Sequence, residues 1–475
     1  MQSFVVQPQA YPDKRAPADR AADFREIADR YAVPPAEAQS SRCAQCGVPY
    51  CTVHCPLHNH IPDWLRLTAE GRLREAYELS NATSSMPEIC GRICPQDRLC
   101  EGNCVIEGSG HGAVTIGSVE RFITDTAWEQ GWVEPLEPGR PTGRSVGIIG
   151  AGPAGLSAAE QLRIAGHDVH VYDRHDRSGG LLTYGIPGFK LEKPVVMRRV
   201  ERLAAGGIHF HNGFEVGRDA TLEELRQRHD AVLIATGVYK ARALKAAGNP
   251  QSGIVEALDY LTASNRKGFG DAVPRFDDGT LDAAGRHVVV VGGGDTAMDC
   301  VRTAIRQKAA SVRCLYRRDR DNMPGSLREV AHAEEEGAEF VWLSAPDAFS
   351  GSDRVTGVRA TAMRLGPADA GGRRAPEPRP DGGFDLPADL VIKALGFDAE
   401  DLPTLWGSPD LGVTRWGTVR VDHRTMMTAL DGVFAAGDIV RGASLVVWAI
   451  RDGREAADNI HAWLRAKAAS ERVAA

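Results

Sequence analysis

The chain has 475 residues, of which 43% are hydrophobic and 25% charged, and its formal net charge is −7. This length allows two or three ordinary cores, and so mild an acidic balance argues against nucleic acid as a partner. No run of about 18 apolar residues is present, and no basic stretch leads into an apolar one near Met1, so we expect a soluble cytoplasmic protein with no membrane partner.

Eight of the ten cysteines lie between residues 43 and 104, among stretches with helical spacing of apolar residues such as 61–78. Disulfides are a poor explanation in a reducing compartment, and metal binding is a better one. Only Cys43 and Cys46 have the CxxC spacing that zinc favours. The run Cys-x2-Cys-x4-Cys-x3-Cys-Pro is closer to the bacterial ferredoxin pattern, in which the proline-flanked cysteine serves a different cluster. We therefore expect iron–sulfur clusters in a helical domain over residues 1–140.

Two units of strand, glycine turn and helix follow, one near residue 145 and one near 287. They predict doubly wound α/β domains with parallel sheets. In the first unit, Gly150, Gly152 and Gly155 follow the strand at 146–149, and the next strand ends in Asp173. Glycines let a backbone approach a pyrophosphate at the positive end of a helix, and a carboxylate accepts hydrogen bonds from a ribose diol. The first unit is therefore predicted to bind a dinucleotide.

The second unit, GGGDTA at 292–297, has alanine at the third small position. Its second strand, SVRCLYRR, ends in Arg317 and Arg318 where the first unit has an acid. An acid would repel a 2′-phosphate, whereas paired guanidiniums can bind it. This unit is predicted to bind NADPH, and the alternative is a solvated basic strand end.

The C-terminal segment GVFAAGDIVRGASLVVWAI resembles the closing motif of two-dinucleotide flavoproteins, in which the aspartate, here Asp438, binds the ribityl chain of the flavin. The helix after it would direct its positive end at the flavin pyrimidine ring. We expect this segment to return to the first unit, which places FAD there. ATG at 235–237 and ALG at 394–396 resemble the domain crossovers of the same superfamily. The NADPH domain is thus predicted as an insertion, 276–395, within an FAD domain of 141–275 plus 396–475.

Two other segments give expectations. A disulfide reductase of similar architecture would carry a redox cysteine pair beside the flavin, but GGLLTYGIP has no cysteine, and Cys300 and Cys314 are 14 residues apart. A thioredoxin-reductase-like role is therefore disfavoured. The stretch GPADAGGRRAPEPRPDGG, 366–383, is rich in glycine, proline and charge, and it is predicted to be a surface loop.

Six motifs carry a family resemblance from about residue 40 to the end of the chain: PEICGRICPQDRLCEGNC, AVTIGSVERFITD, GGLLTYGIPGFKLEK, GGGDTAMDCVRT, LYRRDRDNMPGS and FAAGDIVRG. Together they resemble the small (beta) subunits of bacterial NADPH-dependent glutamate synthases. Related modules occur in dihydropyrimidine dehydrogenase and in electron-bifurcating ferredoxin oxidoreductases. The fold this implies is α/β, with two doubly wound Rossmann-like domains, the second inserted in the first, preceded by a helical iron–sulfur domain.

The resemblance also implies the cofactors FAD, NADPH and two 4Fe-4S clusters. The ligands implied for cluster one are Cys43, Cys46, Cys51 and Cys104. Those implied for cluster two are Cys55, Cys94, Cys100 and a side-chain oxygen of Glu120, which leaves Cys90 as a buried thiol beside it. The residues expected at FAD are Gly150, Gly152, Pro153, Ala154, Gly155, Asp173, Arg174, Gly180, Leu181, Gly437, Asp438 and Leu445. Those expected at NADPH are Gly292, Gly293, Gly294, Asp295, Thr296, Ala297, Arg317 and Arg318.

By the same resemblance, the chain is an electron-input subunit that oxidises NADPH at FAD. Its partner would be the large (alpha) subunit, which makes L-glutamate from L-glutamine and 2-oxoglutarate. No catalytic acid or nucleophile is expected, since the cofactors carry the chemistry. Residue 2 is glutamine, so removing Met1 gives no N-terminal cysteine nucleophile, and the glutamine chemistry is expected on the partner. Two alternatives stay open: a subunit of an electron-bifurcating NADPH/ferredoxin oxidoreductase, and a scaffold whose clusters only hold an interface together.

Overall fold

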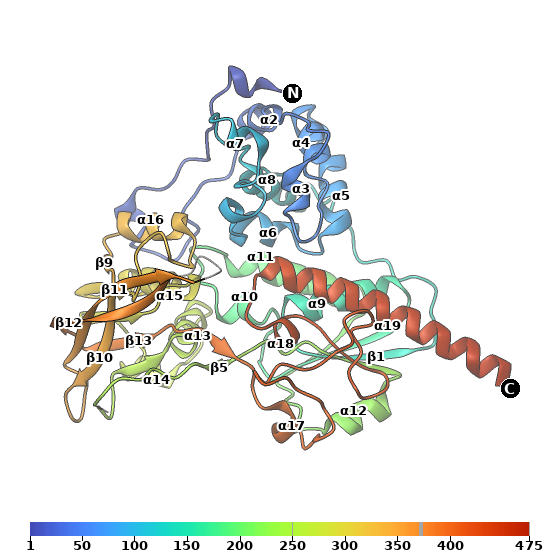
Figure 1. Ribbon diagram of the computed structural model, residues 1–475. Helices are drawn as coiled ribbons and strands as arrows, with labels where there is room; N and C mark the ends of the chain where they lie inside the picture. The colour runs from blue at the N-terminus through green and yellow to red at the C-terminus, as the bar shows by residue number, and fades with distance from the viewer. Residues whose placement is uncertain (249, 370–373, 475) are drawn as a thin grey trace.

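The computed structural model describes residues 1–248, 250–369 and 374–474. Figure 1 shows a helical region, drawn in blue, above two α/β regions, with the yellow and orange one beside the other. Among the described residues, no helix combines the length and the apolar character needed to cross a membrane.

The helical region, called the cap below, is built from short helices, as the cysteine-rich sequence predicts. Trp64, Val119 and Ile123 form part of its core and are almost fully buried. The indole Nε1 of Trp64 donates to Asn59 Oδ1 at 2.9 Å, so this buried polar group is satisfied. The elements of the cap are η1 Ser3–Val5, α1 Pro17–Arg20, α2 Val33–Ser41, α3 Tyr50–Val53, α4 Ile61–Ala69, α5 Leu73–Thr83, α6 Pro87–Ile93, η2 Gln96–Arg98, α7 Val105–Gly108 and α8 Ile116–Glu129.

The first α/β region has a five-stranded parallel sheet in the order β15-β4-β1-β2-β3. Its strands are β1 Ser145–Ile149, β2 Asp168–Asp173, β3 His209–Asn212, β4 Ala231–Ile234 and β15 Val433–Ala435. Its helices are α9 Pro153–Ile164, α10 Leu181–Tyr184, α11 Lys193–Ala205, α12 Leu222–Arg228, α17 Leu402–Leu405, α18 Asp438–Arg441 and α19 Val446–Ala474. Strand β15 pairs with β4, and α19 packs along α9 (Figure 1). The expected return of the C-terminal segment to the first unit is therefore observed.

The second α/β region has another five-stranded parallel sheet, in the order β6-β13-β7-β8-β9. Its strands are β6 Ile254–Glu256, β7 His287–Val291, β8 Ser311–Leu315, β9 Glu339–Val341 and β13 Leu390–Lys393. Its helices are α13 Ala257–Gly268, α14 Pro274–Asp277, α15 Asp295–Arg306 and α16 Leu327–Glu335.

The sheet pairing corrects the predicted start of this region at residue 276. Strand β6 pairs with β13, and Tyr260 and Leu261 of α13 lie in the same buried cluster as Val288 and Met298. Both elements precede residue 276 and share the second core. We therefore propose 242–395 for the NADPH domain, with the cap at 1–140 and the rest of the chain in the FAD domain.

The segment expected to be a surface loop, 366–383, forms strands instead. A three-stranded antiparallel sheet contains β10 Ser344–Ser350, β11 Gly357–Ala368 and β12 Arg374–Pro387, and residues 370–373 of the segment lie outside the described part. Strand β12 is at the edge of this sheet, where a proline without an N–H group is tolerated. The composition of the segment reflects an exposed edge strand rather than a loop.

The two crossovers between the α/β regions lie side by side. Strand β5 Lys240–Ala241 follows the ATG motif, β14 Phe397–Asp398 follows the ALG motif, and the two strands pair antiparallel. This pairing matches the predicted double crossover and the insertion of the second region into the first.

A buried ion pair joins the cap to the FAD domain. Arg199 of α11 donates from Nε to Glu88 Oε1 at 2.7 Å and from Nη2 to Oε2 at 2.8 Å, and the side chains are 2% and 0% exposed. Arg199→Ala should lower the free energy of unfolding by about 3 to 5 kcal/mol, because it leaves the carboxylate of Glu88 buried and unpaired. Urea unfolding followed by fluorescence measures this loss.

The control for this variant is Arg72→Ala just before α5, where both side chains of the ion pair with Glu75 are exposed. It should leave the unfolding curve unchanged. Equal destabilisation by the two variants would contradict a structural role for the Arg199–Glu88 pair.

Candidate functional site: a cavity shared by three domains

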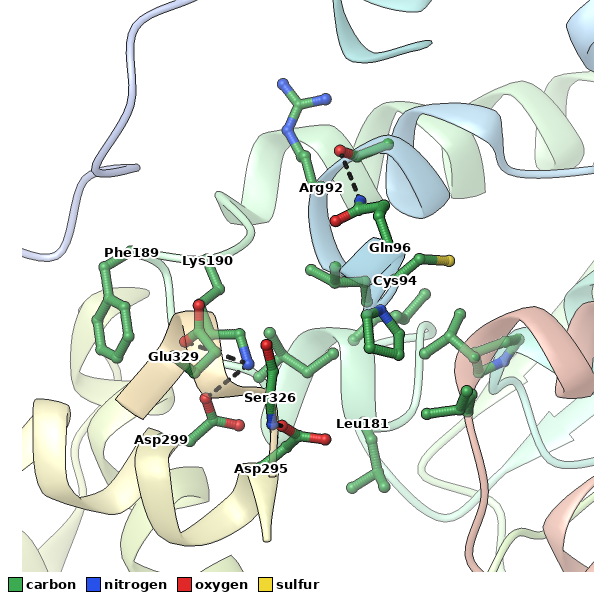
Figure 2. A pocket seen from close by; sticks show the side chains of 18 of the residues that line it. Arg92, Cys94, Gln96, Leu181, Phe189, Lys190, Asp295, Asp299, Ser326 and Glu329 are labelled. Carbon is green, nitrogen blue, oxygen red and sulfur yellow. Dashed lines mark hydrogen bonds and ion pairs between the residues drawn. The ribbon is translucent and has the colours of Figure 1, made fainter. Parts of the chain in front are cut away.

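A cavity of about 740 Å³ lies where the cap and both α/β domains meet. Figure 2 shows Cys94 of the cap, Leu181 of the FAD domain and Asp295 of the NADPH domain around this space. Ten of the residues expected at FAD or NADPH line the cavity: Gly150, Gly152, Pro153, Ala154, Asp173, Leu181, Asp295, Thr296, Asp438 and Leu445. The three sequence regions predicted to hold cofactors therefore converge on one site.

The first glycine turn has the shape that a pyrophosphate site requires. Gly150 has φ 109°, and a Cβ there would lie 2.4 Å from Ala235 O. A Cβ on Gly155 would lie 1.9 Å from Gly150 O, so α9 can pack this close to β1 only with glycine. At Gly152, at the start of α9, a Cβ would meet nothing within 4 Å, which leaves room for a phosphate at the positive end of the helix. A Cβ on Gly180 would lie 2.9 Å from Gly152 Cα, so Gly180 can pack against the glycine turn only because it has no side chain.

Asp173 connects the large cavity with a second one of about 310 Å³. Its Oδ2 accepts from Ala151 N at 2.7 Å and its Oδ1 from His175 N at 2.8 Å, which fixes the carboxylate beside the glycine turn. Arg174 lines the second cavity, pairs with Glu400 at 3.0 Å and stacks over the Tyr239 ring at 4.6 Å. This arrangement suits the adenosine end of a dinucleotide.

Sequence reasoning missed several side chains that line the second cavity, among them Tyr239, Glu400 and Trp406. They come from loops far from the glycine turn along the chain. No spacing rule connects them to it, so no sequence signal could have found them.

Asp438 lies at the start of α18 and faces the large cavity. Ser444 Oγ donates to its Oδ1 at 2.7 Å, and burial raises the pKa of the carboxyl group. Gly437 has φ 78°, and a Cβ there would approach Ala154 Cβ to 2.9 Å, so glycine allows α18 to meet the first turn of α9. Leu445 and the first turn of α19 also line the cavity, as the flavoprotein resemblance implies.

The second glycine turn, like the first, brings glycines too close to neighbouring atoms for a side chain to fit. A Cβ on Gly292 would lie 2.2 Å from Ala394 O, and one on Gly293 would lie 2.3 Å from the Tyr316 ring. At Gly294 a Cβ would meet nothing within 4 Å, so the start of α15 is open to a phosphate. Ala297, in the first turn of α15, is fully buried.

Arg317 and Arg318 follow β8, outside the large cavity. Within the described chain, the buried Nε of Arg318 has no hydrogen-bond partner. A buried donor without a partner is unfavourable, and a phosphate oxygen would satisfy it. The residues present fit a nucleotide with a 2′-phosphate.

Lys190 was also missed in the sequence. It lies on a loop of the FAD domain, and its Nζ is 3.0 Å from Asp299 Oδ1 and 3.7 Å from Glu329 Oε2 of the NADPH domain (Figure 2). Burial raises the pKa of Asp299 to about 6, and Lys190 opposes that rise. The contact holds the two α/β domains together at one wall of the cavity.

The cysteines expected to hold cluster one share a small cavity of about 20 Å³, lined by Cys43, Cys46, Cys51 and Cys104. Burial raises the pKa of Cys51 to about 12 and also raises that of Cys43. Thiols in such a place stay protonated unless a metal supplies positive charge. Four converging thiols, of which those of Cys43 and Cys51 are buried, fit a cluster.

Of the residues expected to hold cluster two, Cys94 borders the large cavity and Glu120 is buried on α8. Burial raises the pKa of Cys55 to about 11, and the charges of Cys90 and Glu120 add to this rise. Burial also raises the pKa of Glu120 to about 8, and Ser80 Oγ donates to its Oε1 at 3.4 Å. A buried carboxylate with so weak a partner fits a metal ligand. Cys90 lies beside this group and forms a hydrogen bond with Cys94. This hydrogen bond is the largest cause of the raised pKa of Cys94.

Comparisons with known proteins find one family match in the cap and another in the two α/β regions. Residues 20–132 match the family profile described as dihydropyrimidine dehydrogenase domain II, 4Fe-4S cluster, and residues 144–453 match pyridine nucleotide-disulphide oxidoreductase. The glutamate synthase [NADPH] small chain of Azospirillum brasilense is 67% identical over 468 residues, which cover 98% of this chain and 97% of that one. This chain belongs to the glutamate synthase small-chain family.

The glutamate synthase [NADPH] small chain of Escherichia coli (strain K12) is 44% identical over 97% of this chain and 98% of that one. Among solved structures, Mycobacterium tuberculosis FprA in complex with NADPH has a TM-score of 0.58 at 20% identity, covering 70% of this chain and 86% of that one. The likeness to FprA shows the α/β fold. As a member of the small-chain family, the protein is an oxidoreductase with a 4Fe-4S domain and an FAD- and NADPH-binding domain.

In this small-chain family member, Glu120 and Cys90 compete for the fourth position at cluster two, and we propose Glu120. Glu120→Ala should lower iron content by about half, because an incomplete ligand set loses one cluster of two. Cys90→Ala should leave the iron content unchanged. Iron analysis and the visible spectrum of the purified variants measure both, and full iron in Glu120→Ala with half in Cys90→Ala would reverse the assignment.

Proposed function

We propose that this chain is the electron-input subunit of a glutamate synthase. It oxidises NADPH at FAD and passes electrons through two 4Fe-4S clusters to a large subunit, which makes L-glutamate from L-glutamine and 2-oxoglutarate. The observation that carries the proposal is that Cys94 of the cap lines the same cavity as Asp438 of the FAD domain and Asp295 of the NADPH domain.

The cofactor set explains why three domains are needed. NADPH gives up two electrons together as a hydride and a 4Fe-4S cluster takes one at a time, whereas a flavin exchanges electrons in both ways. The chain's own residues bind and orient the groups: the glycine turns take the phosphates, and Asp438 takes the ribityl chain. The Lys190–Asp299 ion pair, at 3.0 Å, holds the FAD and NADPH domains in a fixed relative position.

The positions of the two cysteine groups support a direction for the electrons. The cluster-two group borders the flavin cavity through Cys94. Its member Cys100 is close enough to Cys51 of the cluster-one group for the Cys51 charge to raise the Cys100 pKa. The cluster-one cavity is also lined by Tyr50 and Val105, which are 50% and 45% exposed. We therefore propose the order flavin, cluster two, cluster one, partner.

The large subunit as partner rests on the relatives, whose names describe them as small chains of glutamate synthase. Identity over nearly the whole chain favours this function over the bifurcating oxidoreductase. A scaffold would not need two glycine turns with room for a phosphate, so these turns argue against a scaffold role.

The test uses the purified chain loaded with FAD and clusters. It should oxidise NADPH with an artificial dye as acceptor, because the dye takes electrons directly from the flavin. It should form no glutamate from glutamine and 2-oxoglutarate, since neither the FAD nor the NADPH site offers a glutaminase nucleophile. A folded, loaded chain that passes NADPH electrons to no acceptor would overturn the proposal, as would glutamate formation by the chain alone.

A further inference from the structure

The amino-terminal edge of the FAD-domain sheet carries imidazoles that the cofactor site does not use. The glycine turn that begins at Gly150 follows the carboxyl end of β1, whereas Asp168 begins β2 and His209 begins β3. His170 of β2 is the register partner of His209 on β3, the edge strand. Side chains two apart on a strand share a face, so Asp168 and His170 lie on the same face as His209.

The Asp168 carboxylate lies between the two imidazoles. His170 Nε2 is 3.2 Å from Asp168 Oδ2, and His209 Nε2 is 3.4 Å from Asp168 Oδ1. One ligand atom from each of the three residues lies within 4.8 Å of the others. Ligand atoms about 2 Å from a tetrahedral Zn²⁺ are separated by about 3.3 Å, so small side-chain rotations would complete the geometry.

A third imidazole, that of His211, supports the group through His170. His211 Nε2 is 3.0 Å from His170 Nδ1, the nitrogen that points away from Asp168. Metal-ligating imidazoles are usually held in this way through their other nitrogen, which fixes ring orientation.

We propose that Asp168, His170 and His209 form a binding site for one divalent transition-metal ion of the zinc class. Two imidazole nitrogens and a carboxylate oxygen are ligands that Zn²⁺ prefers, and water would complete the coordination. The Asp168 and His209 side chains are 54% and 56% exposed, so the ion can enter directly from solvent. The site joins edge strand β3 to β2, away from the electron path.

Titration calorimetry of the FAD- and cluster-loaded protein with Zn²⁺ near neutral pH tests the proposal. One saturable site is expected, and Asp168→Asn or His209→Ala should weaken its affinity by at least about tenfold. The matched control is His423→Ala, which removes an exposed histidine of the same domain and should leave the affinity unchanged. Absence of a saturable site, or equal zinc binding by His209→Ala and the unaltered chain, would overturn the proposal.

X-ray absorption at the zinc edge separates this site from the cysteines of the cap. Nitrogen and oxygen neighbours with imidazole scattering are expected. Sulfur neighbours would place the zinc at the thiols and would also overturn the proposal.

Discussion

Cys94→Ser should leave reduction of the flavin by NADPH intact and lower electron delivery to the large subunit by about 100-fold or more. Cys94 is both a lining residue of the flavin cavity and a proposed ligand of cluster two. Serine oxygen is a poor replacement, because iron–sulfur clusters select soft thiolate ligands. NADPH oxidation with a dye should therefore continue at the normal rate, while coupled glutamate formation stops.

The matched control is Cys90→Ser, which changes a buried thiol one helical turn earlier in α6. Its hydroxyl can keep the contact with Ser84 Oγ, which is 3.8 Å from the thiol in the unaltered chain. Dye reduction and glutamate formation should both persist. Coupled activity that survives in Cys94→Ser but disappears in Cys90→Ser would show that the ligand assignment is wrong.

The double variant Arg317→Ala/Arg318→Ala should weaken NADPH far more than NADH. Losing charge-assisted contacts to a phosphate costs about 2 to 3 kcal/mol, which is about 30- to 150-fold in affinity. NADH has no 2′-phosphate, so its affinity should change little. The ratio of kcat/KM for the two nucleotides, measured with a dye as acceptor, reports the effect.

Arg320→Ala is the control for this variant. Arg320 lies two residues beyond Arg318 but pairs with Glu334 on the surface at 2.9 Å, with 46% of its side chain exposed. The affinities of the Arg320→Ala variant for NADPH and NADH should equal those of the unaltered chain. Equal losses for NADPH and NADH in the double variant would exclude a 2′-phosphate contact.

The parts of the fold that could be predicted are those with strong local signals. The strands before the two glycine turns, and the helices after them, follow from apolar runs bounded by glycine. Strand β6 has three residues, and its partner β13 lies about 135 residues further along the chain, so no local pattern assigned it to the second sheet. Strand β12 was missed because its prolines and glycines indicate a loop everywhere except at the edge of a sheet.

The candidate site divides in the same way. The glycines and Asp173 occur at spacings that the phosphate and ribose chemistry requires, and the resemblance of the C-terminal segment to a flavoprotein motif pointed to Asp438. Lys190, Tyr239 and Trp406 reach the cavities from loops whose positions depend on tertiary packing. The cysteines were recognisable by spacing, but only the folded chain shows that Cys94 borders the large cavity while Cys43, Cys46, Cys51 and Cys104 line the small one.

The most direct test of the central claim combines this chain with the glutamate synthase large subunit and measures NADPH and glutamate together. The proposed reaction joins one glutamine, one 2-oxoglutarate and one NADPH, so about two glutamates should form for each NADPH oxidised, and only when both chains are present. Copurification of the two chains should accompany this activity. NADPH oxidation without glutamate in the combined system would contradict the account, as would an equal yield of glutamate when this chain is left out.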